Sequence, residues 1–210
     1  MQQIVPIILA AGDSARMGYP KALLPLGRET FLTHILSTLA SLELAEAIVV
    51  LGSHEALIRP LLVNHRVRTY TNPDPARGQM SSLHLAAENL PAGYQGGLIW
   101  PVDQPLISAE LVAALVNLFS CSAAPLVLPR CNGKPGHPAI FGRTLIEELL
   151  AVPPGQTPKT IVSRHRPDAA WLATAETGTI EDIDTPEDYF RCTGVTLESA
   201  LADCSTAEEQ

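Results

Sequence analysis

Residues 9–21, L-A-A-G-D-S-A-R-M-G-Y-P-K, combine glycines with two cations in one short segment. Gly12 and Gly18 tolerate positive φ and let a ligand approach the backbone closely, and the amide N–H groups between them can form an anion-binding nest. Arg16 adds a forked cation and Lys21 a compact one. The segment has neither the G-x-G-x-x-G dinucleotide fingerprint nor the Walker pattern G-x-x-x-x-G-K-[ST]. It predicts a polyphosphate-binding loop, and the alternative is an ordinary strand-to-helix connection with solvated cations.

Asp103 is a second candidate for chemistry, because it follows an apolar run over residues 97–102 that is typical of a buried strand. A carboxylate at the carboxyl end of a central parallel strand faces the crevice in which such sheets bind ligands. Magnesium is commonly held through one or two carboxylates together with phosphate oxygens. The other possible role, capping the next helix, suits Ser108 better. Asp103 is therefore a candidate ligand for Mg²⁺.

Asp182 and Asp184 flank Ile183 near the end of the chain. In a strand both carboxylates would point to the same side, so that one of them could complete a metal site. The next three residues, T-P-E, are also typical of a helix start, with Thr as the N-cap and Pro in the first position. Both interpretations remain open from the residues alone.

Apolar strand-like runs alternate with helical stretches along the chain, which is typical of an α/β domain with a mostly parallel sheet. The expected strands cover residues 4–10, 47–51, 66–71, 97–102 and 125–128, and the more polar 66–71 is expected towards an edge. The expected helices cover residues 30–42, 54–62, 81–88, 108–118 and 143–150. Residues 129–138 and 152–158 are rich in Pro and Gly and are expected to be loops. Ligands are expected beyond the carboxyl ends of the strands, where the strand order reverses.

Charge and composition limit the classes of function. The 210 residues carry a net charge of −8, but ten acidic residues and only one basic residue lie from residue 176 onward, so the body is nearly neutral. No basic stripe indicates nucleic-acid binding, and no apolar run approaches the roughly 18 residues of a membrane span. The four cysteines lack C-x-x-C spacing and are expected to be free thiols. We expect a cytoplasmic protein with a single domain over residues 1–192 and a flexible acidic tail over residues 193–210.

Residues 9–21 resemble the signature loop of MobA-like nucleotidyltransferases, and within that family they are most similar to the MocA-type molybdenum cofactor cytidylyltransferases. The similarity continues in register through N-P-D-P-A-R-G-Q-M-S-S-L, P-V-D-Q-P-L, N-G-K-P-G-H-P and D-I-D-T-P-E-D-Y, which begin at residues 72, 101, 132 and 182. The resemblance implies a Rossmann-like three-layer α/β/α fold with a mostly parallel central sheet, of the nucleotide-diphospho-sugar transferase type. It also implies an NTP donor, Mg²⁺ and release of pyrophosphate.

The resemblance assigns roles to individual residues of this chain. The residues that it implies in nucleotide binding are Ala10, Ala11, Gly12, Ser14, Arg16, Lys21, Gly78 and Ser82, the last two by reading the base. Asp103 and Asp184 are implied as metal ligands, with Asp182 in support. The segment V-D-Q-P departs from the family's G-D-M-P but keeps the acid and the proline. The loop Gly136-His137-Pro138 is implied in acceptor binding, although a lone histidine is by itself most often structural.

These features together predict nucleotidyl transfer, in which a phosphate oxygen of the acceptor attacks the α-phosphorus of an NTP. Arg16, Lys21 and Asp103 are the expected catalytic residues. The L-A-A-G start of the loop favours CTP over GTP, by resemblance only. The implied acceptor is molybdopterin, although the residues leave a related cofactor or a phosphosugar open, and the implied protein partner is a molybdoenzyme or its chaperone.

Two other functions remain open from the sequence. The segment Asp182-Ile183-Asp184 matches the D-x-D motif of a sugar-nucleotide glycosyltransferase, although that motif would normally follow an early strand. A glycosyltransferase would also leave Arg16 and Lys21 without a role. A catalytically silent protein that delivers a cofactor would bind CTP and show no turnover with any acceptor.

Overall fold

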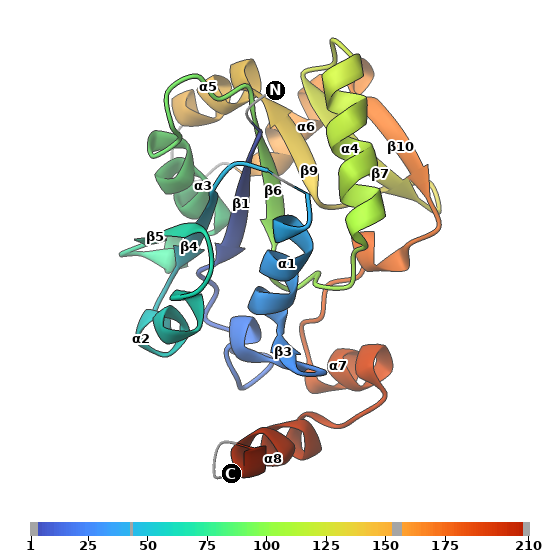
Figure 1. Ribbon diagram of the computed structural model, residues 1–210. Coiled ribbons are helices and arrows are strands. Elements are labelled where there is room, and N and C mark those ends of the chain that lie inside the picture. The colour runs from blue at the N-terminus through green and yellow to red at the C-terminus, as the bar shows by residue number, and fades with distance from the viewer. Residues whose placement is uncertain (1–3, 43, 153–156, 208–210) are drawn as a thin grey trace.

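A computed structural model describes residues 4–42, 44–152 and 157–207, with side chains described up to residue 203. Within these residues an eight-stranded central sheet is covered by helices on both faces (Figure 1). The strand order is β10-β7-β9-β6-β1-β4-β5, and β8 pairs with β7. The expected three-layer α/β/α fold with a mostly parallel central sheet is confirmed.

The centre of the sheet consists of three strands with continuous apolar sequences. They are β1 (Ile4–Ala10), β4 (Ala47–Leu51) and β6 (Gly96–Pro101), and β1 pairs in parallel with both of the others. Every residue of β1 and β4 is buried, as expected for strands that are covered on both faces. The more polar β5 (Val67–Thr71) pairs with β4 and lies at one edge of the sheet, which confirms its expected place.

Two helical layers bury the faces of the sheet. On one face lie α1 (Phe31–Ala40) and α4 (Ala109–Cys121), and on the other lie α3 (Gln79–Glu88), α5 (Arg143–Ala151) and α6 (Pro158–His165) (Figure 1). Each helix turns an apolar stripe towards the strands. The two layers form two hydrophobic clusters that hold the sheet between them.

The region expected as a loop over residues 129–138 contains the end of one strand and the whole of another. β7 (Leu126–Cys131) turns through Asn132 and Gly133, both at positive φ, into the short β8 (Lys134–Pro135). The next strand, β9 (Ala139–Gly142), runs antiparallel between β6 and β7. Four residues are too short a run to show a period, which is why the sequence did not predict β9.

The remaining elements are short or follow the second expected loop. β10 (Ala170–Thr174) pairs in parallel with β7 at the other edge of the sheet and, like α6, was not predicted. Residues 153–156 of the loop expected over 152–158 lie outside the described residues. The short elements are the hairpin of β2 (Pro25–Leu26) and β3 (Glu29–Thr30), the helix α2 (Glu55–Ile58), and 3-10 helices at Lys21–Leu23, Arg59–Leu62, Pro75–Arg77, Arg166–Asp168 and Thr177–Thr179.

The C-terminal region is helical where a frayed tail was expected. α7 (Pro186–Thr193) crosses the expected boundary at residue 192, and α8 (Leu197–Ala207) follows it at the lower end of Figure 1. Leu197 packs against the main hydrophobic cluster and Ala200 is buried in it, so α8 has an apolar contact with the domain. The expectation of a frayed tail is therefore wrong for α8, and residues 208–210 lie outside the described part.

Two expectations from composition can be compared with the described residues. Cys121, Cys131 and Cys192 are free thiols, as expected, and the side chain of Cys204 lies outside the described part. Among the helices that the structure describes, none combines the length and the apolar character that a membrane crossing requires.

Candidate active site

The loops after β1 and β6 meet at one edge of the sheet. β4 and β5 lie on one side of β1 and β6 lies on the other, so the strand order reverses between β1 and β6. Just beyond the paired strands, the N–H of Val102 donates to the carbonyl oxygen of Leu9 at 3.2 Å. Open α/β sheets bind their ligands at such a reversal. The glycine-containing loop and Asp103 therefore share one crevice.

Ser14 organises the loop that follows β1. It has a positive φ of 56°, and its carbonyl oxygen accepts the N–H groups of Met17 and Gly18, each at 3.0 Å. Its hydroxyl accepts the N–H of Lys21 at 3.0 Å. Met17 is buried and anchors the loop in the core. These bonds hold Lys21 at a defined position near the carboxyl end of β1.

Two glycines show which side of this loop is packed and which side is open. A methyl group on Gly52, just after β4, would overlap the carbonyl oxygen of Ala11. A methyl group on Gly12 would meet nothing within 4 Å, and Gly12 lines the cleft described below. The loop therefore packs against Gly52 and leaves Gly12 open towards the cleft.

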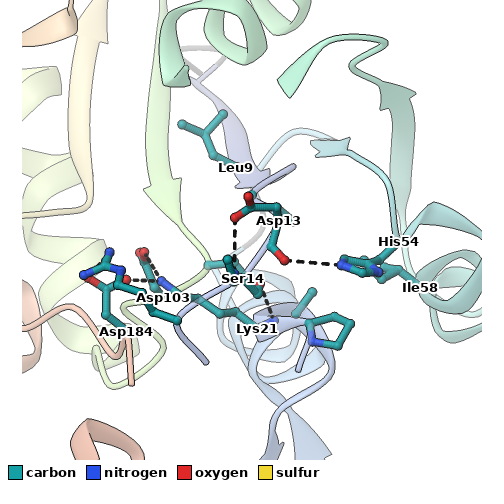
Figure 2. A pocket seen from close by; sticks show the side chains of 15 residues that line it. Leu9, Asp13, Ser14, Lys21, His54, Ile58, Asp103 and Asp184 are labelled. Carbon is teal, nitrogen blue, oxygen red and sulfur yellow. Dashed lines mark hydrogen bonds and ion pairs between the residues drawn. The ribbon is translucent and has the colours of Figure 1, made fainter. Parts of the chain in front are cut away.

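Lys21 stands between two carboxylates that come from distant parts of the chain (Figure 2). Its Nζ donates to Oδ2 of Asp103 at 3.0 Å and to Oδ1 of Asp184, which are 82 and 163 residues away. The other oxygen of Asp184 lies 2.8 Å from Nη2 of Arg16. The side chain of Lys21 is 14% exposed and that of Arg16 is 71% exposed. Lys21 is thus the inner cation of the cluster and Arg16 the outer one.

The positive charge of Lys21 is stabilised by the two neighbouring carboxylates. Burial lowers its pKa, but the charges of Asp103 and Asp184 and the hydrogen bonds to them outweigh this effect and raise the pKa above its ordinary value of 10.5. Lys21 is therefore a cation at neutral pH. The cluster presents cations for a polyanion next to carboxylates for a metal ion.

A cleft of about 300 Å³ opens around this cluster. Of the residues expected to form the site, those that line the cleft are Ala10, Gly12, Ser14, Arg16, Lys21, Asp103 and Asp184. The expected site residues that do not line it are Ala11, Gly78, Ser82, Gly136, His137 and Pro138. The structure therefore brings together the phosphate-loop candidates and both metal-ligand candidates in one cavity.

His54 also lines the cleft, although the sequence analysis found no role for it. Its Nε2 lies 3.4 Å from the carbonyl oxygen of Asp13, and Figure 2 shows the ring on the far side of the loop from Asp103. No motif marks His54 in the sequence. It reaches the cleft because β4 pairs with β1, so the residues after each strand become neighbours.

Residues 182–184 follow an irregular path, and the two aspartates have different partners. Asp184 contacts Lys21, whereas Oδ1 of Asp182 accepts a hydrogen bond from Nε2 of Gln104 at 2.7 Å. Ile183 between them is buried. The strand alternative, in which both carboxylates would point to the same side, is therefore wrong.

The helix start that the sequence also allowed is present. Thr185 is the N-cap of α7, and its hydroxyl accepts the N–H of Asp188 at 3.2 Å. Oδ2 of Asp188 in turn accepts the N–H groups of Asp184 at 3.2 Å and of Thr185 at 3.0 Å. This capping box holds the backbone of Asp184 in place.

Gly78 and Ser82 lie at the start of α3. Gly78 is exposed, with a φ of 83°, and serves as the residue before the helix. Ser82 is buried, and its hydroxyl accepts a hydrogen bond from Nδ2 of Asn72 at 2.9 Å. The side chain of Ser82 is thus engaged inside the fold, and the exposed backbone of Gly78 is the part of this loop that a base could reach. Their role in base recognition stays a prediction.

The loop over residues 136–138 packs against Thr179. A methyl group on Gly136 would overlap the carbonyl oxygen of Thr179, and the N–H of His137 donates to the same oxygen at 2.8 Å. Nδ1 of His137 is buried without a hydrogen-bond partner among the described residues. Burial lowers the pKa of His137 against the opposing charge of Asp103, so the ring is neutral near pH 7. Contact with an acceptor stays a prediction for this loop.

Asp103 and Asp184 form a donor set that suits magnesium. Both bond to the same nitrogen of Lys21, so their carboxylates are close neighbours. Within the described part of the chain, no group of three or more His, Cys, Asp or Glu side chains could cage a metal ion. Magnesium does not need such a cage, because it uses one or two carboxylates together with water and substrate phosphates.

Comparison with known proteins agrees with this geometry. Residues 6–170 match the model of the MobA-like NTP transferase domain. A probable molybdenum cofactor guanylyltransferase of Rhodopirellula baltica is 35% identical over 127 residues, which cover 60% of this chain and 60% of the relative. The molybdenum cofactor cytidylyltransferase of Escherichia coli K12 is 27% identical over 192 residues, which cover 90% of this chain and 95% of the relative.

A solved structure is similar over nearly the whole chain. The crystal structure of Rv0371c from Mycobacterium tuberculosis H37Rv superposes with a TM-score of 0.81 at 26% identity, over 92% of this chain and 98% of that one. The family match includes the loop after β1, Lys21 and Asp103, which are residues that meet in the cleft. On this combination of sequence and fold, the chain belongs to the MobA-like NTP transferase family.

Proposed function

We propose that this protein transfers a cytidylyl group from CTP to the phosphate of a molybdopterin-type acceptor, with Mg²⁺ as its metal. Membership of the nucleotidyltransferase family supports the type of reaction. The acceptor is inferred from relatives that are named molybdenum cofactor guanylyltransferase and cytidylyltransferase. The observation that carries the proposal is the cluster of Arg16, Lys21, Asp103 and Asp184 in one cleft at the strand-order reversal.

The triphosphate is assigned to the loop after β1. Arg16 and Lys21 supply the positive charge, and the backbone of Ala10, Gly12 and Ser14, which line the cleft, supplies close contacts. Ala11 supports the loop by packing against Gly52. Reactions at phosphorus depend mainly on positioning and on neutralisation of the developing negative charge. Lys21 is suited to this role because it is held as a cation on a rigid loop.

The transfer needs no general base from the protein. A phosphate oxygen of the acceptor forms a bond to the α-phosphorus, and the bond from the α-phosphorus to the bridging oxygen breaks. The electron pair of that bond leaves with pyrophosphate, whose charge Arg16 and Lys21 neutralise. The acceptor phosphate is already ionised near pH 7, which agrees with a cleft whose proposed catalytic groups are cations and carboxylates.

Asp103 and Asp184 are the proposed ligands for Mg²⁺. The bound ion supplies charge neutralisation for phosphate oxygens and orients them. In the structure these two carboxylates bond to the ammonium of Lys21. Metal ligation by these carboxylates would leave Lys21 available to the phosphates.

The choice of CTP and the acceptor contacts are inferred from individual loop residues. The L-A-A-G segment favours CTP by its resemblance to cytidylyltransferases. Base recognition is assigned to the exposed backbone of Gly78. Ser82 supports that loop from inside the fold through its hydrogen bond with Asn72. The loop over residues 136–138 is assigned to the acceptor side.

Two measurements test the proposal. Thermal unfolding is followed with CTP, GTP, UTP and ATP, each with and without Mg²⁺, since a bound ligand raises the melting temperature by mass action. The largest shift is expected for CTP with Mg²⁺, and a larger shift with GTP would overturn the base preference. Pyrophosphate release is then measured with each NTP and a molybdopterin acceptor. Binding of CTP without release would instead support a cofactor-delivery protein.

A single substitution tests the catalytic role of Lys21. Lys21→Met keeps the aliphatic stem, removes the charge and is expected to lower the rate of pyrophosphate release by about 100-fold or more. Lys159→Met removes an exposed lysine of α6 and serves as the matched control, with the wild-type rate expected. Wild-type release by Lys21→Met would show that Lys21 is not catalytic.

A further inference from the structure

Gln104 is a buried polar side chain next to Asp103. It is 4% exposed, and its Nε2 donates to Oδ1 of Asp182 at 2.7 Å across 78 residues of sequence. Burying an amide without a hydrogen bond is unfavourable, so the bond to Asp182 offsets part of the cost of burying Gln104. It links the segment that carries Asp103 to the segment that carries Asp184.

Both backbone polar groups of Gln104 are hydrogen-bonded. Its N–H donates to the carbonyl oxygen of Pro101 at 3.2 Å, and its own carbonyl oxygen accepts from Nε1 of Trp100 at 2.8 Å. Trp100 is completely buried in the main hydrophobic cluster. The amide of Gln104 therefore projects from a rigid turn, and its position is set by the core.

A second bond runs between the same two segments. The N–H of Ile183 donates to the carbonyl oxygen of Asp103 at 2.9 Å, and the side chain of Ile183 is buried. Asp182 and Asp184 flank Ile183. Asp182 is held by its bond from Gln104, and Asp184 is held by its own contacts with Lys21 and Arg16. With both bonds made, residues 182–184 are tied to the loop that follows β6.

Gln104 has no other side-chain bond among the described residues. Its Oε1 is buried without a partner there, so the contact with Asp182 is the one hydrogen bond of the amide within this part of the chain. Loss of the acceptor at Asp182 would leave a buried amide unpaired, which is unfavourable. The two residues therefore act as a pair.

We propose that Gln104, through Asp182, is a positioning residue that sets the separation of the carboxylates of Asp103 and Asp184 for metal binding. The inference rests on the proposed function, because it takes these two carboxylates as the metal ligands. Groups that orient metal ligands typically contribute about 10–100-fold to metal affinity or activity. Gln104 itself touches neither the nucleotide nor the metal in this role.

The test measures metal binding separately from turnover. Mn²⁺ serves as the probe, and its binding in the presence of CTP is followed by electron paramagnetic resonance, together with kcat, KM for CTP and the melting temperature. Gln104→Met keeps the volume of the side chain and removes the amide. Asp182→Asn keeps an oxygen that accepts the same bond, and Asp182→Ala removes it.

Gln104→Met and Asp182→Ala are each expected to weaken Mn²⁺ binding and lower kcat by about tenfold or more, with KM for CTP within about twofold of wild type because the phosphate loop is untouched. Asp182→Asn is expected to retain wild-type Mn²⁺ affinity. The double variant Gln104→Met with Asp182→Ala is expected to be no worse than either single variant, since both remove one bond.

Wild-type Mn²⁺ affinity in Gln104→Met, or equal losses in Asp182→Asn and Asp182→Ala, would overturn the positioning role. So would a lower melting temperature with unchanged metal affinity, because it would show a purely structural pair. Failure of the proposed function looks different: the wild-type protein itself would then show no metal-dependent CTP binding and no pyrophosphate release.

Discussion

Nζ of Lys21 lies 3.0 Å from Oδ2 of Asp103, although 82 residues separate them in the sequence. The contact joins the loop after β1 to the loop after β6 at the reversal of strand order. The same nitrogen also bonds to Asp184, so two carboxylates share one ammonium group. This arrangement makes the charge balance of the cleft depend on Lys21.

Removal of the Lys21 charge is expected to strengthen metal binding in the absence of nucleotide. In Lys21→Met the carboxylates of Asp103 and Asp184 lose their shared cation, so a divalent ion meets more uncompensated negative charge. Mn²⁺ affinity without nucleotide is expected to rise by about tenfold, the equivalent of about 1.4 kcal/mol. Titration followed by electron paramagnetic resonance measures it, and Lys159→Met provides the control for loss of one positive charge. Equal affinities in wild type and Lys21→Met would show that Lys21 does not compete with the metal.

The stability contributed by Lys21 is expected to be lost only at high pH. Its pKa is raised in the folded protein, so the contribution is complete below the unfolded value of 10.5 and disappears as the pH rises through the folded value. The difference in unfolding free energy between wild type and Lys21→Met is therefore expected to stay constant from about pH 7 to about pH 9 and to shrink above 10.5. Urea unfolding at a series of pH values measures this difference. A decline that is already present at pH 9 would contradict the raised pKa.

Asp188 is expected to stabilise α7 and the adjacent Asp184. Burial raises its pKa, but hydrogen bonds from Thr185, Arg191 and the backbone outweigh that effect, and the pKa is lowered. Asp188→Ala removes the capping box and is expected to reduce the free energy of unfolding by about 1 kcal/mol. Because the folded pKa is depressed, this contribution is present above 3.8 and is lost as the pH falls through the folded value.

Chemical unfolding of Asp188→Ala at neutral and acidic pH provides the measurement. The control is Glu187→Ala in the same first turn of α7, where only a helix-dipole effect of a few tenths of a kcal/mol is expected. Equal losses in the two variants would show that the capping box of Asp188 contributes nothing beyond its charge.

Gly52 and Gly12 are expected to respond differently to the same substitution. Gly52→Ala places a methyl group against the carbonyl oxygen of Ala11 and is expected to destabilise the protein by about 1–3 kcal/mol. Gly12→Ala meets no atom within 4 Å, so its melting temperature is expected to stay near that of wild type while its affinity for CTP falls. Thermal unfolding with and without CTP separates the two effects. A stable Gly52→Ala protein would show that the loop does not rest on this glycine.

Local patterns predicted several elements closely. The apolar runs of β1 and β4 were expected with the bounds that the structure has, because strands covered on both faces need continuous apolar sequence. Ser108 was expected as the cap of α4, and its hydroxyl accepts the N–H of Leu111 at 3.1 Å. Such signals lie within a few residues of one another and can be read directly.

Elements that depend on distant partners were harder to predict. β9 has four residues and gains its hydrogen bonds from β6 and β7, which lie on either side of it in the sheet. Residues 182–184, where the sequence left a strand and a helix start open, follow an irregular path, because the N–H of Ile183 bonds to Asp103 while the flanking aspartates have separate partners. α8 was expected as a tail, since its few apolar contacts are made with a surface formed by other segments.

The sequence alone predicted a polyphosphate-binding loop, because glycines, Arg16 and Lys21 lie close together after a buried strand, although an ordinary strand-to-helix connection stayed open. The position of Asp103 after an apolar run also predicted a metal ligand, and the family resemblance favoured Asp184 as the second one; both assignments stay predictions. Only the tertiary structure decided that Lys21 bonds to both carboxylates and that Gln104 holds Asp182. The physical reason is that side-chain distances across 78 to 163 residues depend on how the strands are ordered in the sheet, and no local pattern encodes that order.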